Sequence, residues 1–498
     1  MKEGTRIGNA VYRQATTGNG ISRRDAIKSL GLLGGLGALA ATGLTACGRI
    51  AAENRALPIR PPTGVRVIEP YGPLARSADS PALDIPSAFR CVTISSGGVP
   101  SRARPDFMVP NAFDGMAAFP LSNGNVRLIR NHEMVDPPQP AQAFGTPYYD
   151  GGASGGTTSL EIRIVGSGED LEVVLVDEFA SLTGTLFNCA GGPTPWGSWL
   201  SCEETTVGTS RGYDRPHGYI FEVRSAATSP EEAVPLRDMG RFVHEAIAVD
   251  PGTGFVYETE DAYYVPTRPD RPGAGLYRFI PNRPGVLAAG GRLQILAVTD
   301  QPGYVTARGQ TLGMTVQAHW IDLDRPDPPE AEDDPLALFR EGLSKGAAVF
   351  ARLEGAFPGD GGIYVVSTNG GEAQAGQVFH YRPTSRDAGE LTTVFESPSR
   401  DVLDGPDNIV VSPRGGLLMC EDARGTEFIR GLDREGSIVD LVRAPHVVRT
   451  PEPGEFAGAC FSPDGRVLFF NVQGSHLVGA GASSTTYALW GPWEDGPL

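Results

Sequence analysis

Short acidic clusters flank apolar segments along the chain, and they are the first residues whose type and spacing could do chemistry. They comprise Glu133, Glu203, Glu204, Glu245, Glu260, Asp261, Glu354, Asp407, Glu421 and Asp422. If the fold gathers these carboxylates, they cannot share a small volume unprotonated without cations. Calcium takes six to eight oxygen ligands from such side chains. The pattern therefore predicts a site that holds several metal ions.

Two further side chains stand beside these clusters. Cys189 could ligate a metal as a thiolate, or it could be a small buried hydrophobic residue. Arg352 lies two residues before Glu354, so it is either a salt-bridge partner or an anion clamp. A guanidinium contacts two phosphate oxygens at once, which favours Arg352 over a lysine for that purpose. We expect His132 and His244 to be structural.

Six repeated hairpins must position these residues. Each unit starts at a polar or acidic residue, runs through an apolar strand and a Gly-containing turn, and ends in polar or acidic residues. The turns lie at 122–125, 195–197, 250–254, 360–362, 413–416 and 463–465. The first residue of one arm and the last residue of the other lie side by side, opposite the turn. Each hairpin thus delivers its flanking residues to one rim.

The repeat predicts an all-β fold, a six-bladed β-propeller with loop and short helical insertions and a metal site at one mouth of the central channel. The chain has 498 residues, of which 65 are Gly and 42 are Pro, and 40% are hydrophobic. The Gly and Pro content indicates many turns, and the hydrophobic content indicates a sizeable core. This combination excludes a helical bundle. An apolar-periodic helix at 336–343 is the insertion between the third and fourth units. A β-sandwich with unrelated hairpins is the alternative.

Charge and cysteine content exclude other classes of protein. The formal charge is −17, from 42 basic and 59 acidic residues, which argues against nucleic-acid binding. Six cysteines without a CxxC pair make a zinc ribbon or a disulfide scaffold improbable. Cys202 and Cys420 are expected in the blade core, and Cys91 could pair with Cys460.

The N-terminus has the pattern of an export signal. Residues 1–46 contain Ser22-Arg23-Arg24 and then a mildly apolar segment, which is typical of a twin-arginine signal; a transmembrane anchor is the alternative. Residues 44–47 end in Cys47 and resemble a lipoprotein box, in which the cysteine would be acylated. The alternative is ordinary cleavage of the signal without a lipid. Residues 47–85 read as a linker and 86–498 as the catalytic propeller. We expect a periplasmic, extracellular or lipid-anchored protein.

Five segments resemble the PhoX family of bacterial alkaline phosphatases. They are NCAGGPTPWGSWLSCEE at 188–204, GRFVHEAIAV at 240–249, ARLEG at 351–355, PDNIVVSPRGGLLMCED at 406–422 and EFAGACFSPDGRVLFFNVQ at 455–473. The resemblance runs from about residue 90 to about 475. It implies a six-bladed propeller that hydrolyses small phosphate esters, monoesters above all, with two ferric ions bridged by an oxo group and with calcium ions beside them.

The resemblance also implies roles for individual residues. Cys189, Glu245 and Glu354 look like iron-side ligands, and Arg352 looks like the phosphate contact. Further metal ligands would be Glu204, Glu260, Asp261, Asp407, Asn408, Glu421 and Asp422. Thr259-Glu260-Asp261 departs from the Gly-Asp-Asp that the family often shows, which puts that calcium position in doubt. We expect a monomer that reaches the membrane only through a lipid on Cys47.

Two other functions fit the same pattern. One is a propeller that hydrolyses another ester, such as a lactone, with calcium alone. The other is a non-catalytic propeller that binds partners at the cell surface, with calcium in a structural role.

Overall fold

The computed structural model describes residues 59, 64–423, 425–445, 454–479 and 481–498. The predicted signal at 1–46 and Cys47 lie outside these residues, as does most of the first half of the predicted linker. Within the described part of the chain, no helix has both the length and the apolar character that a membrane crossing requires.

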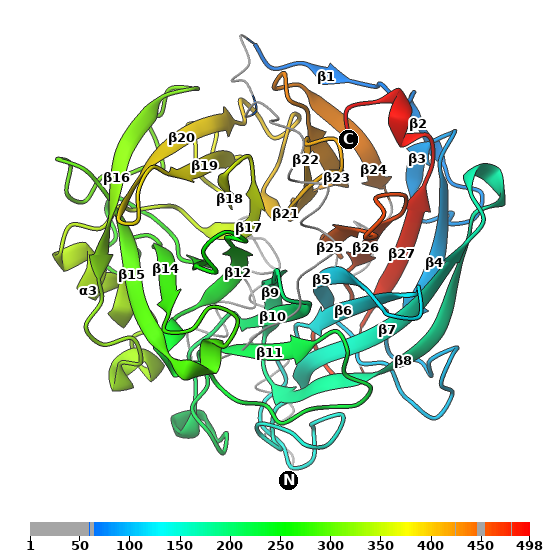
Figure 1. Ribbon diagram of the computed structural model, residues 1–498, viewed down its shortest axis with the longest axis horizontal. Coiled ribbons are helices and arrows are strands. Elements are labelled where there is room, and N and C mark those ends of the chain that lie inside the picture. The colour runs from blue at the N-terminus through cyan, green and yellow to red at the C-terminus, as the bar shows by residue number, and fades with distance from the viewer. Residues whose placement is uncertain (1–58, 60–63, 424, 446–453, 480) are drawn as a thin grey trace.

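Antiparallel sheets radiate around a central axis, as Figure 1 shows, and the predicted six-bladed β-propeller is confirmed. The first three blades consist of β5 (Phe113–Pro120), β6 (Val126–His132), β7 (Gly155–Val165) and β8 (Glu172–Thr185); β9 (Asn188–Pro193), β10 (Ser198–Glu203) and β11 (Ile220–Arg224); and β12 (His244–Val249), β13 (Val256–Glu260), β14 (Leu276–Pro281), β15 (Gly291–Val298) and β16 (Thr315–Asp322). In every blade the first strand named is nearest the axis, and the strands follow outward in sequence order. The sixth blade is the exception, because its outermost strand comes from an earlier part of the chain.

The remaining blades follow the same order. They consist of β17 (Leu353–Gly359), β18 (Gly362–Ser367), β19 (Gln377–Pro383) and β20 (Ala388–Glu396); β21 (Pro406–Val411), β22 (Leu417–Glu421), β23 (Glu427–Leu432) and β24 (Ile438–Ala444); and β25 (Phe456–Phe461), β26 (Leu468–Val472) and β27 (Thr485–Trp490), completed by β4 (Arg90–Ser96). β16 also pairs with β20, so the third and fourth blades share one sheet.

The ring closes through both ends of the propeller sequence. β27 pairs antiparallel with β4, from Thr485 with Ser96 to Trp490 with Arg90. The innermost strands contact one another in the order β5, β9, β12, β17, β21 and β25, and β25 returns to β5. A closed ring of inner strands is what the convergence of the hairpin ends requires.

The predicted linker contributes to the fold in its second half. β1 (Val67–Ile68), β2 (Leu74–Arg76) and β3 (Asp84–Pro86) extend the sheet of the fifth blade. Asp84 on β3 forms ion pairs with Arg76 and with Arg443 on β24. The segment is rich in Pro, Ala and Arg, which predicted a linker, yet its apolar residues Leu83 and Ile85 are buried against that blade.

The core fills the spaces between neighbouring blades, because alternate residues of each strand face the adjacent sheet. Cys202 and Cys420 lie in this core, as predicted. The described cysteines are all free, so Cys91 and Cys460 form no disulfide.

The predicted helix is α3 (Ala337–Ser344), and its Leu338 and Phe339 join the same core. Short 3-10 helices lie at Gly168–Asp170, Thr209–Arg211, Arg237–Met239, Leu287–Ala289, Pro329–Glu332 and Trp493–Asp495.

Candidate metal centre

Five of the six inner strands carry a possible metal ligand at the same position, the second residue of the strand. These residues are Asp114, Cys189, Glu245, Glu354 and Asp407, and all of them are buried. At each of these residues the pairing with the second strand shifts register, so that two residues oppose one. Such a β-bulge bends the strand and redirects a side chain. The bulges thus aim all five groups at the axis.

A small residue often follows the ligand because the next blade comes very close. At Gly355 an added Cβ would lie 2.4 Å from the carbonyl oxygen of Asp407, and at Gly115 it would lie 2.9 Å from that of Cys189. Both distances are too short for any side chain. The glycines therefore let adjacent ligand-bearing strands touch.

A second ring of residues follows the second strand of each blade. It comprises Glu133, Glu204, Asp261, Thr368, Asp422 and Gln473. In every blade the backbone N–H of this residue donates to the carbonyl just before the inner strand, at N···O distances from 2.8 to 3.2 Å. This repeated hydrogen bond places the second ring beside the first, as the hairpin geometry predicted.

The two rings bring their side chains together in four overlapping groups. The groups are Asp114, Glu133 and Cys189; Cys189, Glu204 and Glu245; Glu245, Glu354 and Asp407; and Asp407, Asp422 and Glu455. Within each group the ligand atoms lie within 4.8 Å of one another. Because successive groups share Cys189, Glu245 and Asp407, they form one continuous row across the mouth of the propeller. We call these nine residues the metal row.

The donor set fits metal ions. Eight of the nine side chains in the metal row are carboxylates, the ninth is a thiol, and none is a histidine. All are buried, where low dielectric strengthens the repulsion between like charges. Hard cations with oxygen ligands would relieve that repulsion. The row offers several adjacent positions for such cations.

Arg352 provides positive charge at the edge of the metal row. Its Nε lies 3.0 Å from Oδ1 of Asp261 and its Nη2 lies 2.7 Å from Oε1 of Glu354. Its side chain is only 3% exposed.

The backbone of Arg352 is left-handed, with φ of 50°. Phe187 and Gly405, which also directly precede an inner strand, have φ of 56° and 63°. In these three blades the residue before the inner strand adopts this conformation, which normally favours glycine.

Four predicted ligands lie outside the metal row. The first two are Glu260 and Glu421. Each is the last residue of its strand and precedes a residue of the second ring, and side chains alternate between the two sides of a strand. Glu260 instead accepts hydrogen bonds from the N–H of Gly275 at 2.8 Å and the hydroxyl of Tyr277 at 2.9 Å. Burial raises the pKa of Glu260 to about 8.

Glu421 has an equivalent structural environment. Its carboxylate accepts the N–H of Asp404 at 2.9 Å and pairs with Nε of Arg430 at 3.0 Å. Burial raises its pKa to about 8.

Asn408, also predicted as a ligand, donates to Oδ1 of Asp407 at 2.9 Å and accepts the N–H of Gly458 at 2.5 Å. It holds Asp407 in place. Asp261 lies in the second ring but contacts Arg352 and belongs to none of the four groups.

Three members of the metal row were not assigned as ligands from the sequence. They are Asp114 and Glu455, which open the first and the sixth hairpin, and Glu133, which the sequence placed only among the converging carboxylates. A usable signal was present. Asp114 opens the first hairpin as Glu245 opens the third, so equivalence between repeats would have included it.

Residues of one blade hold the ligands of the next. Asn131 on β6 donates to the carbonyls of Cys189 and Ala190 at 3.0 and 2.7 Å. Thr259 donates to the carbonyl of Glu354 at 2.5 Å, and Asn471 to that of Asp114 at 2.6 Å. These bonds link three of the ligand-bearing strands to the preceding blade, so the geometry of the metal row depends on the closed ring.

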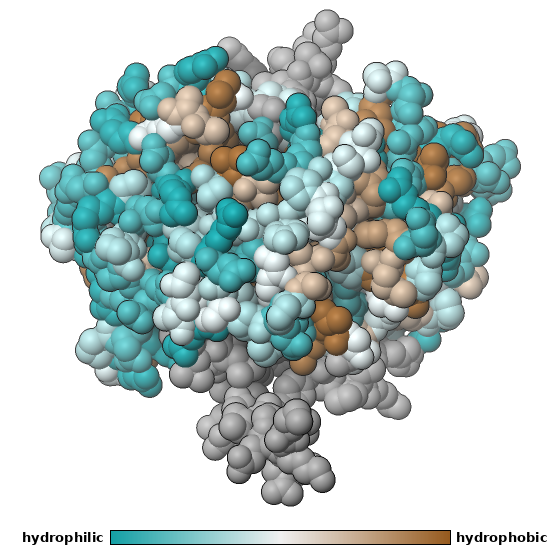
Figure 2. All heavy atoms as spheres, turned by 90° about the horizontal axis from the view of Figure 1, so that it is seen from below, coloured by the Kyte–Doolittle hydropathy of each residue, from teal (hydrophilic) through white to brown (hydrophobic). Residues whose placement is uncertain are grey.

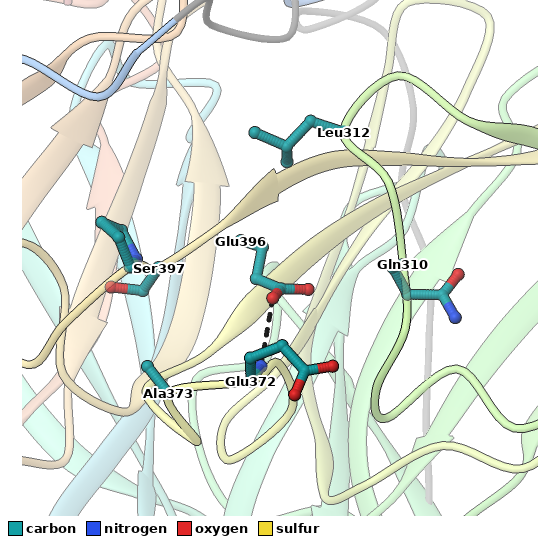
Figure 3. Close-up of a pocket in the computed structure, with 7 residues that line it drawn as sticks. Gln310, Leu312, Glu372, Ala373, Glu396 and Ser397 are labelled. Carbon is teal, nitrogen blue, oxygen red and sulfur yellow. Dashed lines mark hydrogen bonds between the residues drawn. The ribbon is translucent and has the colours of Figure 1, made fainter.

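A separate hollow lies away from the metal row. Gln310, Leu312, Glu372 and Glu396 are among the residues that line it, as Figure 3 shows. The backbone N–H of Glu372 donates to Glu396 at 3.1 Å. No residue of the metal row lines this hollow, so it is not part of the candidate site.

Fold and site together define a β-propeller metalloprotein with an arginine beside a buried row of acidic ligands. A family model described as alkaline phosphatase PhoX matches residues 69–475. The chain belongs to this family, and it is a phosphoric ester hydrolase. The resemblance found in the sequence is thereby confirmed, whereas the lactone hydrolase and the non-catalytic propeller are not supported.

One solved structure shows the same fold. Pseudomonas fluorescens PhoX in complex with vanadate, a transition state analogue, is 17% identical, with a TM-score of 0.60 over 86% of this chain and 98% of that chain. A putative gluconolactonase is 12% identical, with a TM-score of 0.36 over 82% and 94% of the two chains. A search of curated proteins gave no match.

Proposed function

We propose that the protein hydrolyses small phosphate monoesters at the metal row, with iron and calcium as its ions. The central groups, which contain Cys189, Glu245 and Glu354, would hold the iron pair. The outer groups, which contain Glu133, Asp422 and their neighbours, would hold calcium. A thiolate suits iron better than calcium, whereas clustered carboxylates suit calcium.

The ions would supply Lewis-acid charge and lower the pKa of water at the site. The chain's own residues do the rest of the work. Arg352 binds two oxygens of the phosphoryl group and steadies the charge that develops on them. Asp261 and Glu354 orient its guanidinium, because both lie within 3.0 Å of it. The buried surroundings exclude bulk water, which strengthens these electrostatic contacts.

The observation that carries this proposal is the metal row with Arg352 at its edge. The experiment is elemental analysis of the purified protein together with hydrolysis of p-nitrophenyl phosphate and bis-p-nitrophenyl phosphate, with calcium added. We expect bound iron and calcium, faster turnover of the monoester, and inhibition by vanadate, which the Pseudomonas fluorescens protein binds. Calcium without iron would overturn the ion assignment. A fully loaded protein that hydrolyses neither ester would overturn the function.

Two matched variants test which carboxylates hold the ions. Glu204→Gln removes a member of the metal row, so we expect the protein to lose at least one metal equivalent and most of its activity. Glu421→Gln also removes a buried carboxylate at the end of the second strand of a blade, but Glu421 lies outside the metal row. Its metal content should therefore stay at the wild-type level. Equal metal loss in both variants would contradict the assignment.

We also propose that the protein works outside the cytoplasm after export by the twin-arginine route. The support is the Arg23-Arg24 pair with the apolar segment that follows it. Replacing both arginines with lysine should retain the protein in the cytoplasmic fraction. Cys47→Ser should release it from membranes if the cysteine is acylated, and an unchanged distribution would refute the lipid.

A monomer is the proposed assembly. One chain closes its own ring of blades. The face in Figure 2 is mostly polar with small apolar patches. Sedimentation velocity of the loaded protein tests this, and a dimer at micromolar concentration would contradict it.

A further inference from the structure

The loop from Ala262 to Gly273 contacts Arg352. The backbone N–H of Arg352 donates to the carbonyl of Ala262 at 2.9 Å, at the start of the loop. At its end, Ala274 and Phe350 exchange two backbone hydrogen bonds of 3.0 Å. Both ends of the loop are thus attached to the segment that carries the arginine. The loop also begins immediately after Asp261, the partner of Arg352.

One aromatic ring of this loop contacts two guanidinium groups. The Tyr263 ring centroid lies 5.2 Å from Cζ of Arg352 and 4.9 Å from Cζ of Arg271. Because both cations contact the same ring, their Cζ atoms are at most about 10 Å apart. Tyr263 is half-buried. A ligand on Arg352 therefore has a ring and a second cation within reach.

The two arginines of this loop have different electrostatic surroundings. Arg268 pairs with Asp270 at 2.6 Å, and both are exposed. Arg271 forms no ion pair with any of the described residues, and it is half-buried beside Tyr263. The neighbouring Asp270 interacts with Arg271 electrostatically, but its ion pair is with Arg268. A half-buried guanidinium that forms no ion pair in the described part of the chain, next to an anion clamp, is suited to an anionic group of a ligand.

We propose that Tyr263 and Arg271 form a subsite for the leaving group of the substrate, selecting phosphate esters whose leaving group carries a second anionic group. The phosphoryl group would bind Arg352, the body of the leaving group would lie along Tyr263, and a carboxylate or second phosphoryl would bind Arg271. This proposal rests on the proposed function of Arg352. A loop in which Arg271 only stacks on Tyr263 for rigidity would show no such selectivity.

The test is calorimetric binding of two non-hydrolysable ligands to the metal-loaded protein, benzylphosphonate and 4-carboxybenzylphosphonate. The wild type should bind the carboxylated ligand about tenfold more tightly, which is the effect of one charge-assisted hydrogen bond. Arg271→Ala should abolish this preference and leave benzylphosphonate binding unchanged. Arg268→Ala, the control in the same loop, should keep the preference. Tyr263→Leu should weaken both ligands.

The possible failures are distinguishable. Equal binding of both ligands by the wild type, or an Arg271→Ala variant that weakens both alike, would refute the subsite and leave the phosphate site standing. If neither ligand binds the loaded wild type at millimolar concentration, the proposed phosphate site is itself wrong, and the subsite is refuted with it.

Discussion

Asn131 provides the sharpest test of how neighbouring blades hold the metal row. Its side chain is fully buried and uses its whole hydrogen-bonding capacity. Its oxygen accepts from Trp199 at 2.8 Å and Ser201 at 2.9 Å, while its nitrogen donates to Cys189 and Ala190. Asn131→Asp keeps the acceptor and removes both donors. It removes only the two bonds to the carbonyls of β9 and keeps those from Trp199 and Ser201, which also lie in the second blade.

The magnitude follows from those two bonds. Each buried carbonyl that loses its donor costs about 1–3 kcal/mol, so the two losses in Asn131→Asp should lower the free energy of unfolding by about 2–6 kcal/mol. The new carboxyl would also face two carbonyl oxygens, which adds to the loss. Asn282→Asp is the control, because Asn282 also donates to a carbonyl, that of Ala289 at 3.0 Å, but is exposed. It should cost less than about 1 kcal/mol.

The assay combines urea denaturation with the metal content and visible spectrum of the loaded protein. We expect Asn131→Asp to lower the unfolding midpoint and to reduce metal bound beside Cys189, since the carbonyl that fixes this residue has lost its donor. A stability within about 1 kcal/mol of wild type would refute the energetic reasoning. Lower stability with wild-type metal content and spectrum would show that Cys189 is held by other contacts.

Three further predictions concern the ligand thiolate, the strained arginine and the fifth blade. Cys189→Ser should weaken any thiolate-to-iron absorption band and reduce activity, and an unchanged spectrum would remove Cys189 from the iron site. Arg352→Gly should be more stable than Arg352→Ala by about 1 kcal/mol in thermal unfolding, because the left-handed φ of 50° suits glycine. Equal stability of the two variants would refute backbone strain at this residue. Both variants should lose about 2–4 kcal/mol of transition-state binding, measured as kcat/KM. Desolvation acts to raise the pKa of Asp84, but hydrogen bonds from Arg443 and Arg76 outweigh it and hold the pKa below its usual value. The pairing therefore stabilises the fold above about pH 4 and is lost as the pH falls below that value; Asp84→Asn should remove this part of the acid sensitivity in pH-dependent denaturation.

The hairpin repeat was sufficient to predict the fold and the convergence of the acidic residues. Turn residues and apolar strands are local signals, and the geometry of a hairpin fixes which ends meet. The repeat also predicted that Cys189, Glu245, Glu354 and Asp407 would lie together, as they do. Whether each holds an ion remains a prediction.

The sequence could not separate the two residues of each acidic pair. At Glu260-Asp261 and Glu421-Asp422, one side chain faces the axis and the other faces away, and a shift of one residue in strand register would exchange them. The bulge in the inner strand sets that register, and a bulge has no reliable sequence signal. Contacts between blades, such as that of Asn131 with Cys189, depend on residues far apart in sequence and were equally out of reach.

The pairing of β27 with β4 has a consequence for biosynthesis. The partner of Arg90 is Trp490, so the propeller cannot be completed until residue 490 has left the ribosome. Until then the sixth blade lacks a strand, and the residues that gather the ligands have no fixed neighbours. Deleting residues 485–498, which removes all of β27, should therefore abolish metal retention throughout the protein, including ligands in blades that the deletion does not touch.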